Sequence, residues 1–307
     1  MPLPRPAVSP DVRTRHTLPP DAVREALRGT FGALTHWNPM PSGRSNRSWL
    51  ADTGAAQTVV KVFPTPEQSQ ALPGNPLFPN DPQDEVKALH HLADSGFAPR
   101  ILGYGQSAGG AYVLYAHVPA RGAAATDEIA RLLSRLHGTT PPEGLRATPD
   151  GSAALDRQTL RILDLCTSGT LKQRILAARP QGEVPASGRR YFLHGDPVPG
   201  NILSTGRGLV LIDWQCPAIG DPSEDLAIFL SPSMQMAYGQ PPLGDGERRR
   251  FLAAYGDADM AARYHALAPW YHWRMAAYGL WRHDRLGEEG IQAISAELAA
   301  LRSVRPG

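Results

Sequence analysis

The sequence of 307 residues carries 31 Lys and Arg against 29 Asp and Glu, a net charge of +2, and 42% of its residues are hydrophobic. This is the composition of an ordinary soluble globular protein with a substantial core, and it excludes the strongly basic surface typical of proteins that bind nucleic acid. No run of roughly 18 uncharged apolar residues, the length that crosses a bilayer, occurs in the sequence.

The cysteine content and the N-terminal composition indicate a reducing compartment. Cys166 and Cys216 have no metal-type spacing and are too few for a disulfide framework. The first residues contain no apolar core of the kind found in signal peptides. We therefore expect a cytoplasmic protein without a membrane partner.

The chain begins with a segment that predicts no regular structure. Residues 1–20 contain six prolines and no hydrophobic period, so we expect a flexible arm. Asp21 follows and can cap a short helix over residues 22–27, which ends near Gly29.

Two strands joined by a turn come next. A polar loop leads into a strand that ends near Leu50, residues 52–54 predict a turn, and residues 57–63 predict the second strand. Lys61 lies in this second strand, where a lysine among β-branched residues usually faces solvent on an edge strand. The loop before the first strand has the composition of an ordinary hairpin loop and contains Ser42, Gly43, Ser45 and Asn46.

The next region alternates between a helix and further strands. Residues 64–83 form a polar insertion, and residues 84–92 show helical spacing with Glu85 in the first turn, where the helix dipole favours an acid. Strands are predicted over 100–104 and 111–117, which together with the first pair suggest a small antiparallel sheet packed on one helix. After a hinge at 118–122 the pattern is helical, over residues 127–136, 154–166 and 171–178.

Residues 191–230 contain the most informative pattern of the chain. An apolar run leads into His194-Gly195-Asp196, and a loop rich in Pro and Gly ends at Asn201. A hairpin over 202–212 then ends at Asp213. Carboxylate and amide oxygens are the hard ligands that Mg²⁺ prefers, so this segment predicts a metal and phosphate site.

The spacing of these residues matches known phosphoryl-transfer chemistry. In the kinase catalytic loop an Asp accepts the proton of the substrate hydroxyl, an Asn five residues later holds Mg²⁺, and a second Asp completes the metal site. Here Asn201 follows Asp196 by five residues, and Asp213 follows Asn201 by twelve. The pattern predicts that Asp196 orients the attacking hydroxyl and that Asn201 and Asp213 hold Mg²⁺.

This stretch resembles the aminoglycoside phosphotransferase/choline kinase family. The resemblance rests on His194-Gly195-Asp196, Asn201-Ile202-Leu203, Ile212-Asp213-Trp214 and Gly220-Asp221-Pro222 followed by Asp225-Leu226-Ala227. Pro197 and Val198 replace the Leu and second His of the usual loop, HGDLHPGN. Outside this stretch the resemblance depends on one lysine, one glutamate and the order of the elements.

The resemblance implies an α+β, two-lobed, protein-kinase-like fold. A small antiparallel-sheet N-lobe over 21–117 would bind the nucleotide, and a larger helical C-lobe over 118–307 would carry catalysis and the substrate site. The hinge would hydrogen-bond adenine through its backbone. His194 would shape the catalytic loop, and Asp225, with Asp221 nearby, would brace the backbone of that loop without binding metal.

The resemblance also implies a nucleotide site in the N-lobe. Lys61 would contact the α- and β-phosphates of ATP, and Glu85 would pair with Lys61. Ser42, Gly43, Ser45 and Asn46 would belong to the loop that covers the phosphates. An alternative remains open for each of these features. Lys61 could be exposed to solvent, Glu85 could be placed only by the helix dipole, and the loop could be an ordinary hairpin loop.

The C-terminal region predicts three helices and informs the choice of acceptor. The helical patterns cover 247–255, 261–282 with a break near Pro269, and 287–304. The middle one carries an aromatic stripe that is more typical of a core than of a binding cage, although aromatic faces suit an ammonium group: Tyr264, Trp270, Tyr271, Trp273, Tyr278 and Trp281. Acids and arginines are balanced from residue 234 onward, without the surplus carboxylates that a polycationic aminoglycoside requires.

The sequence therefore predicts an ATP- and Mg²⁺-dependent phosphotransferase acting on a hydroxyl of a small molecule, such as the amino alcohols choline or ethanolamine. An aminoglycoside phosphotransferase is the first alternative, and a catalytically silent nucleotide-binding protein is the second, although such a protein would be expected to lose the lysine, the Asp or the metal ligands. A protein kinase is disfavoured, because the eleven residues between Asp213 and Asp225 leave no room for an activation segment. The acceptor, the choice between ATP and GTP, and the state as monomer or homodimer remain open.

Overall fold

The computed structural model describes residues 18–40, 45–54, 56–70, 74–167, 169–286 and 289–304. The chain forms two compact units. Of the described residues, the smaller unit comprises those up to Ser69 together with Leu102–His117, and the larger unit comprises those in Gln70–Ile101 and from Val118 onward. The larger unit is mainly helical, and the predicted α+β fold, with its antiparallel sheet in the N-terminal part, is confirmed.

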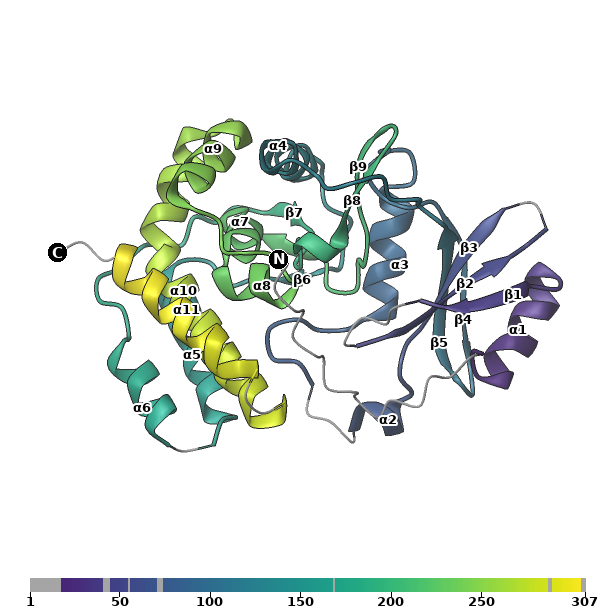
Figure 1. Ribbon diagram of the computed structural model, residues 1–307, viewed down its shortest axis with the longest axis horizontal. Coiled ribbons are helices and arrows are strands. Elements are labelled where there is room, and N and C mark those ends of the chain that lie inside the picture. Colours follow the sequence, from purple (N-terminus) through teal and green to yellow (C-terminus); the bar gives the residue numbers. More distant parts are fainter. Residues whose placement is uncertain are drawn as a thin grey trace, which may run out of the picture. The chain divides into compact units, whose positions relative to one another are not determined.

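The smaller unit is built on a five-stranded sheet with the strand order β1-β2-β3-β5-β4 (Figure 1). Its elements are α1 (Asp21–Phe31), β1 (Thr35–Pro39), β2 (Arg47–Asp52), β3 (Gln57–Val62), α2 (Pro66–Gln70), β4 (Ile101–Ser107) and β5 (Gly110–Ala116). Strand β3 pairs antiparallel with β2 on one side and with β5 on the other, so it is a central strand.

Helix α1 covers one face of this sheet. Val23 and Leu27 of α1 pack in one buried cluster with alternate residues of the strands, Trp49, Val60 and Leu114 among them. The period of two along β3 places Lys61 on the opposite face from Val60. Lys61 is 3% exposed. The interpretation of Lys61 as a solvent-exposed residue of an edge strand is therefore wrong, because β3 is flanked by strands on both sides.

The larger unit contains nine of the described helices and two small sheets. The helices are α3 (Pro82–His91), α4 (Thr126–His137), α5 (Ser152–Asp164), α6 (Thr170–Ala177), α7 (Ser223–Leu230), α8 (Pro232–Ala237), α9 (Asp245–Tyr255), α10 (Ala258–Leu286) and α11 (Glu289–Val304). The strands are β6 (Arg146–Ala147), β10 (Ala218–Gly220) and β7 (Tyr191–Leu193) in one sheet and the hairpin of β8 (Ile202–Thr205) and β9 (Gly208–Leu211) in the other.

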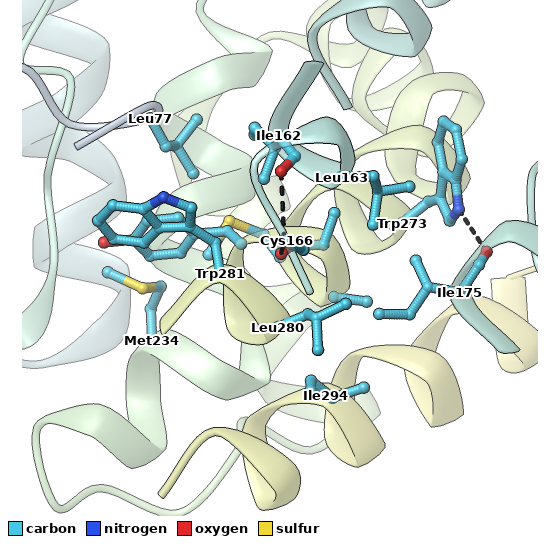
Figure 2. Packing of buried hydrophobic residues seen from close by; sticks show 14 of the residues in the cluster. Leu77, Ile162, Leu163, Cys166, Ile175, Met234, Trp273, Leu280, Trp281 and Ile294 are labelled. Atoms are coloured by element: carbon cyan, nitrogen blue, oxygen red, sulfur yellow. Dashed lines mark hydrogen bonds between the residues drawn. The ribbon is translucent and has the colours of Figure 1, made fainter. Parts of the chain in front are cut away.

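The core of the larger unit forms where α5, α6, α10 and α11 meet, as Figure 2 shows. The Trp273 indole donates to the Ile175 carbonyl at 2.7 Å, and the Cys166 thiol donates to the Ile162 carbonyl at 3.2 Å. All six aromatic residues of the predicted stripe are buried in this unit. The six residues of the stripe are thus core residues, as their spacing indicated.

Helix α10 differs from the prediction at Pro269. The helix runs without interruption from Ala258 to Leu286, whereas the sequence predicted a break. A proline inside a helix costs about 3 kcal/mol because it removes one hydrogen bond and crowds the preceding turn. Ala268 and Trp270 are both buried on either side of it, and their packing offsets this cost.

Residues 70–101 group with the larger unit, although the predicted N-lobe included them. Leu77 and Phe78 lie in the core of the larger unit, and the Asp81 N–H donates to the Gln215 carbonyl at 3.0 Å. The assignment of residues 21–117 to nucleotide binding and of residues 118–307 to catalysis stays a prediction. Among the helices described, none has the combination of length and apolar character needed to cross a bilayer.

Candidate active site

Strand β7 delivers the chain into the segment His194–Asn201, here called the catalytic loop. The strand is held by antiparallel pairing with β10, in which Leu193 lies opposite Ala218. Gly195 then turns the chain with φ of +81°, a left-handed conformation that glycine adopts without penalty. A Cβ atom at this position would lie 2.1 Å from the Cys216 carbonyl oxygen, so the loop also needs glycine for space.

Asp196 and Asn201 meet inside the catalytic loop. The Asn201 side-chain amide donates to the Asp196 backbone carbonyl at 2.9 Å and to its Oδ2 atom at 3.3 Å. The Val198 N–H also donates to the Asp196 carbonyl, and the Asn201 N–H donates to the Val198 carbonyl. These bonds fold the six-residue segment back on itself and bring the predicted proton acceptor beside the predicted metal ligand.

Asp213 follows the hairpin of β8 and β9. Its neighbour Ile212 is hydrogen-bonded to both ends of the catalytic loop. The Ile212 N–H donates to the Asn201 carbonyl at 2.9 Å, and the Ile212 carbonyl accepts from His194 Nε2 at 3.0 Å. Asp213 itself has φ of +64°, an uncommon conformation for a residue with a side chain. Such strain is found preferentially at functional sites.

The oxygen ligands that Asp213 and Asn201 offer are of the chemical kind that binds a magnesium ion. Asp213 supplies a carboxylate and Asn201 an amide oxygen, both hard ligands. Mg²⁺ is usually held by one or two carboxylates and completed by the phosphates of the nucleotide, so a partial set of protein ligands is what its chemistry requires. The binding of the ion by these two residues stays a prediction.

His194 shapes the catalytic loop through both of its ring nitrogens. Nδ1 accepts from the Asp196 N–H at 3.2 Å, and Nε2 donates to the Ile212 carbonyl. These two partners require the neutral tautomer with the proton on Nε2. His194 therefore has the loop-shaping role that the resemblance implied, since its ring links the backbone of Asp196 to that of Ile212.

Asp225, in the first turn of α7, braces the start of the catalytic loop. Its two carboxylate oxygens accept from the His194 N–H at 2.8 Å and from the Gly195 N–H at 2.9 Å. Asp221 makes no such bond and instead accepts from Ser223 and pairs with Arg263. The bracing role implied by the resemblance thus belongs to Asp225, and Asp221 holds the turn before α7.

His137 is a contributor that the sequence did not reveal. Its Nε2 donates to Asp225 Oδ2 at 3.1 Å, and its Nδ1 lies 2.9 Å from the Tyr255 hydroxyl. Burial alone would raise the pKa of Asp225, but the hydrogen bond and charge of His137 outweigh that effect and leave the pKa below its ordinary value. His137 is the last residue of α4, and its local sequence gives no sign of this role because its partners are distant in sequence.

A matched pair of substitutions tests whether His137 holds Asp225. In His137→Gln the amide nitrogen replaces Nε2 and keeps a donor toward Asp225, whereas in His137→Asn it replaces Nδ1 and does not. We expect kcat to fall about tenfold in the Asn variant and less than about threefold in the Gln variant, with the KM for ATP unchanged in both. Steady-state kinetics on protein of verified fold measures this difference, and equal losses of kcat in the two variants would contradict the role.

A second pair of substitutions separates the space that Gly195 needs from its backbone conformation. Gly256 has φ of +84°, close to that of Gly195, but a Cβ there meets nothing within 4 Å. We expect Gly256→Ala to cost about 1 kcal/mol from conformation alone, and Gly195→Ala to cost at least about 3 kcal/mol because the Cys216 carbonyl must move. Chemical denaturation measures both, and equal costs would show that the close approach is not a constraint.

Arg146 also supports the loop and was not singled out from the sequence. It lies on β6, and its Nη2 atom donates to the Cys216 carbonyl at 2.9 Å, the same oxygen that restricts Gly195. Cys216 itself is buried, and burial raises the pKa of its thiol well above the ordinary value. Nothing in the local pattern around Arg146 indicated this contact, because β6 has only two residues.

The remaining residues are those predicted for the nucleotide site. Ser42 and Gly43 lie outside the described residues, whereas Asn46 is buried and Ser45 is half-buried before β2. Lys61 is buried on β3 of the smaller unit, and Glu85 is buried in the first turn of α3 of the larger unit. Their pairing, and the contacts of all six residues with ATP, stay predictions.

Comparison with known proteins identifies the family. The sequence model of the phosphotransferase enzyme family (APH) matches residues 36–270 of this chain. This span includes β2, β3 and the whole segment from the catalytic loop to α7. A comparison with curated proteins found no match.

Solved structures of similar fold include members of two groups of enzymes. The choline kinase LicA from Streptococcus pneumoniae is 17% identical, with a TM-score of 0.60, covering 92% of this chain and 98% of that one. A choline/ethanolamine kinase family protein from Mesorhizobium loti is 14% identical, with a TM-score of 0.60 and coverage of 91% and 94%. A spectinomycin phosphotransferase, in complex with ADP and spectinomycin, is 13% identical, with a TM-score of 0.60 and coverage of 92% and 97%. At these identities the similarity shows the fold.

Proposed function

The chain belongs to the phosphotransferase enzyme family, a family of small-molecule kinases, and from this premise we propose that it transfers the γ-phosphoryl group of ATP to the hydroxyl of a small amino alcohol. Mg²⁺ would be the metal cofactor. The observation that carries the proposal is the pairing of Asp196 with Asn201 in a loop braced by Asp225. Phosphoryl transfer depends chiefly on positioning and charge stabilisation, which such a rigid loop supplies.

Each residue of the site would have one role. Asp196 would accept the proton of the attacking hydroxyl as the O–P bond forms. Asn201 and Asp213 would hold Mg²⁺, which when bound neutralises charge on the phosphates. Lys61, supported by Glu85, would bind the α- and β-phosphates, and the backbone around Ser45 and Asn46, with Ser42 and Gly43, would cover them.

The choice of an amino alcohol is supported by how the C-terminal acids are used. A polycationic antibiotic needs several carboxylates that are available to it. Most acids of the described C-terminal region already accept from protein groups: Asp245 from Arg248, Glu247 from the Gly244 N–H, Asp257 from the Met260 N–H, Asp284 from the Thr167 N–H, and Glu297 from two serines and His272. A small acceptor with one positive charge makes less demand on carboxylates.

A panel assay tests the proposal directly. ADP release is measured with Mg-ATP in the presence of choline, ethanolamine, homoserine, a neutral sugar, two aminoglycosides and a peptide mixture. We expect turnover with one or both amino alcohols and none with peptides. Turnover only with an aminoglycoside would favour the second candidate function, an aminoglycoside phosphotransferase. The similarity of the fold to the spectinomycin phosphotransferase supports this candidate. Tight ATP binding without transfer to any alcohol would favour a catalytically silent protein.

A further inference from the structure

The first turn of α7 is bonded both to the catalytic loop and to helix α10. Asp225 accepts from the loop, whereas the residue before it, Glu224, pairs with Arg274 of α10. Consecutive residues of a helix point about 100° apart, so two adjacent side chains reach partners in different directions. The first turn of α7 therefore links α10 to the segment that carries Asp196.

Arg274 and Glu224 form a buried ion pair with two hydrogen bonds. Nη2 of Arg274 donates to Glu224 Oε1 at 2.6 Å, and Nη1 donates to Oε2 at 3.0 Å. Arg274 is 0% exposed and Glu224 is 4% exposed. Nη1 of Arg274 also donates to Oε1 of Gln158 on α5, at 2.9 Å. A planar guanidinium bonded at two points fixes the direction of its partner as well as the distance.

Tyr271 makes a second contact between α10 and the same turn of α7. Its hydroxyl lies 2.8 Å from the Ser223 hydroxyl, and the guanidinium of Arg274 lies 5.1 Å from the centroid of its ring. Burial raises the pKa of Tyr271 well above its ordinary value, so this hydroxyl keeps its proton. Ser223 and Glu224 are thus both bonded to α10, immediately before the residue that holds the catalytic loop.

The free energy of folding alone gives little reason for this ion pair. Removing two charges from water is costly, and apolar side chains of similar volume often replace a buried pair without loss of stability. Apolar side chains would not, however, fix the rotation of α7 about its axis. A rotation of about 10° moves an atom that lies about 5 Å from the axis by roughly 1 Å. Such a shift would break the bonds of 2.8 and 2.9 Å that Asp225 makes to the catalytic loop.

From this geometry we propose that Arg274 is a positioning residue for phosphoryl transfer, which acts through Glu224 to fix α7 and so holds Asp225 against the catalytic loop. The effect on kcat rests on the proposed function, whereas the effect on the loop does not depend on any substrate. A misplacement of about 1 Å caused by a residue remote from the chemistry can lower a rate by about 10².

Arg274→Lys tests this role, because lysine keeps the positive charge but replaces the two-point contact with a single ammonium group. We expect kcat to fall about tenfold, with the KM values for ATP and for the acceptor within about twofold of native. The amide hydrogens of His194 and Gly195 should exchange with solvent about tenfold faster, because Asp225 holds them less firmly. Their exchange is measured by NMR on protein without substrate.

The control is Trp273→Phe, one position away on the same helix. Trp273 is also 0% exposed, but its indole donates to the Ile175 carbonyl of α6 and not to α7. Urea is added to the more stable of the two variants, so that both have the same free energy of unfolding. Under these conditions the His194 and Gly195 amides should still exchange about tenfold faster in Arg274→Lys. Equal exchange rates in the two variants would overturn the inference.

A double variant, Glu224→Leu with Arg274→Met, separates positioning from stability, and it decides the question if Arg274→Lys does not fold. It leaves neither charge of the pair behind, so the urea midpoint of unfolding is expected at or above that of the native protein. We nevertheless expect kcat to stay about tenfold low and the exchange of the loop amides to stay fast. Native kcat together with native exchange in this variant would show that the ion pair serves stability alone.

Exchange and turnover together distinguish this inference from the proposed function. Fast exchange of the loop amides in Arg274→Lys, in a protein that phosphorylates none of the alcohols, would refute the proposed function and leave the link from Arg274 to the loop standing. Native exchange in an Arg274→Lys protein that retains native kcat would overturn the inference and leave the phosphotransferase proposal intact.

Discussion

Asp196→Ala will reduce kcat for phosphoryl transfer by about 10³, while the dissociation constant for ATP stays within about threefold. A positioned proton acceptor typically contributes this much to the rate. The substitution is expected to spare the loop, because the stronger bond of the Asn201 side chain, at 2.9 Å, goes to the Asp196 backbone carbonyl, which alanine retains. The longer contact of the amide to Oδ2, at 3.3 Å, is lost.

The measurement combines a coupled assay with nucleotide titration. Turnover is followed under saturating Mg-ATP with the acceptor found in the panel, and ATP binding is followed by calorimetry. Asp196→Asn serves as the matched variant, since it keeps the shape of the side chain but cannot accept a proton at neutral pH. A kcat within about tenfold of the native value in both variants would remove Asp196 from the chemistry.

The second large effect is expected for Asp225→Ala, which should lower the free energy of unfolding by about 3 to 5 kcal/mol and abolish most activity. The change leaves three buried donors without their acceptor: the His194 N–H, the Gly195 N–H and His137 Nε2. Unsatisfied buried donors are costly because they lose their hydrogen bonds without gaining water. The catalytic loop then loses the bonds that set the direction of Gly195 and Asp196.

Asp221→Asn is the control for this effect. Asp221 is as deeply buried as Asp225 and stands four residues before it, but it binds Ser223 and Arg263 and not the catalytic loop. We expect the control to lose stability while the folded fraction keeps its kcat. Denaturation curves and kinetics on the same preparations separate the two quantities, and an Asp225→Ala protein with native kcat would show that the bracing is dispensable.

The same carboxylate predicts how stability depends on pH. The pKa of Asp225 in the folded chain lies below its ordinary value of about 3.8, because the His137 hydrogen bond and nearby positive charge outweigh burial. The contribution of the Asp225 carboxylate to the free energy of unfolding is therefore complete above about pH 4. It is lost as the pH falls through the depressed pKa of the folded state. In Asp225→Asn the free energy of unfolding should fall less steeply below pH 4 than in the native protein.

The catalytic loop could be predicted from sequence because its information is local. Asp196, Asn201 and Asp213 stand within eighteen positions. The short loop joins Asn201 to Asp196, and the hairpin returns Ile212, the neighbour of Asp213, to the Asn201 carbonyl. Most helices could be predicted for the same reason, since their apolar spacing is regular over ten or more residues.

Features that depend on distant partners could not be predicted. His137 is bonded to Asp225 and Tyr255, which lie 88 and 118 positions away. Lys61 sits in a strand whose pattern is typical of an edge, and only the pairing with β5 places it in the centre of the sheet. Helix α10 passes through Pro269 because both sides of that position are packed, which the proline itself does not signal.

The way the chain is divided between the two units limits how it can be cut. Because residues 70–101 belong with the larger unit, the polypeptide leaves the smaller unit and returns to it before residue 118. A fragment that stops at His117 would carry Leu77 and Phe78 without the core that buries them, and the complementary fragment would lack those side chains. Each of these fragments would expose apolar surface, so either one expressed alone is expected to aggregate. A split version of this enzyme is expected to assemble only when both fragments are produced in the same cell.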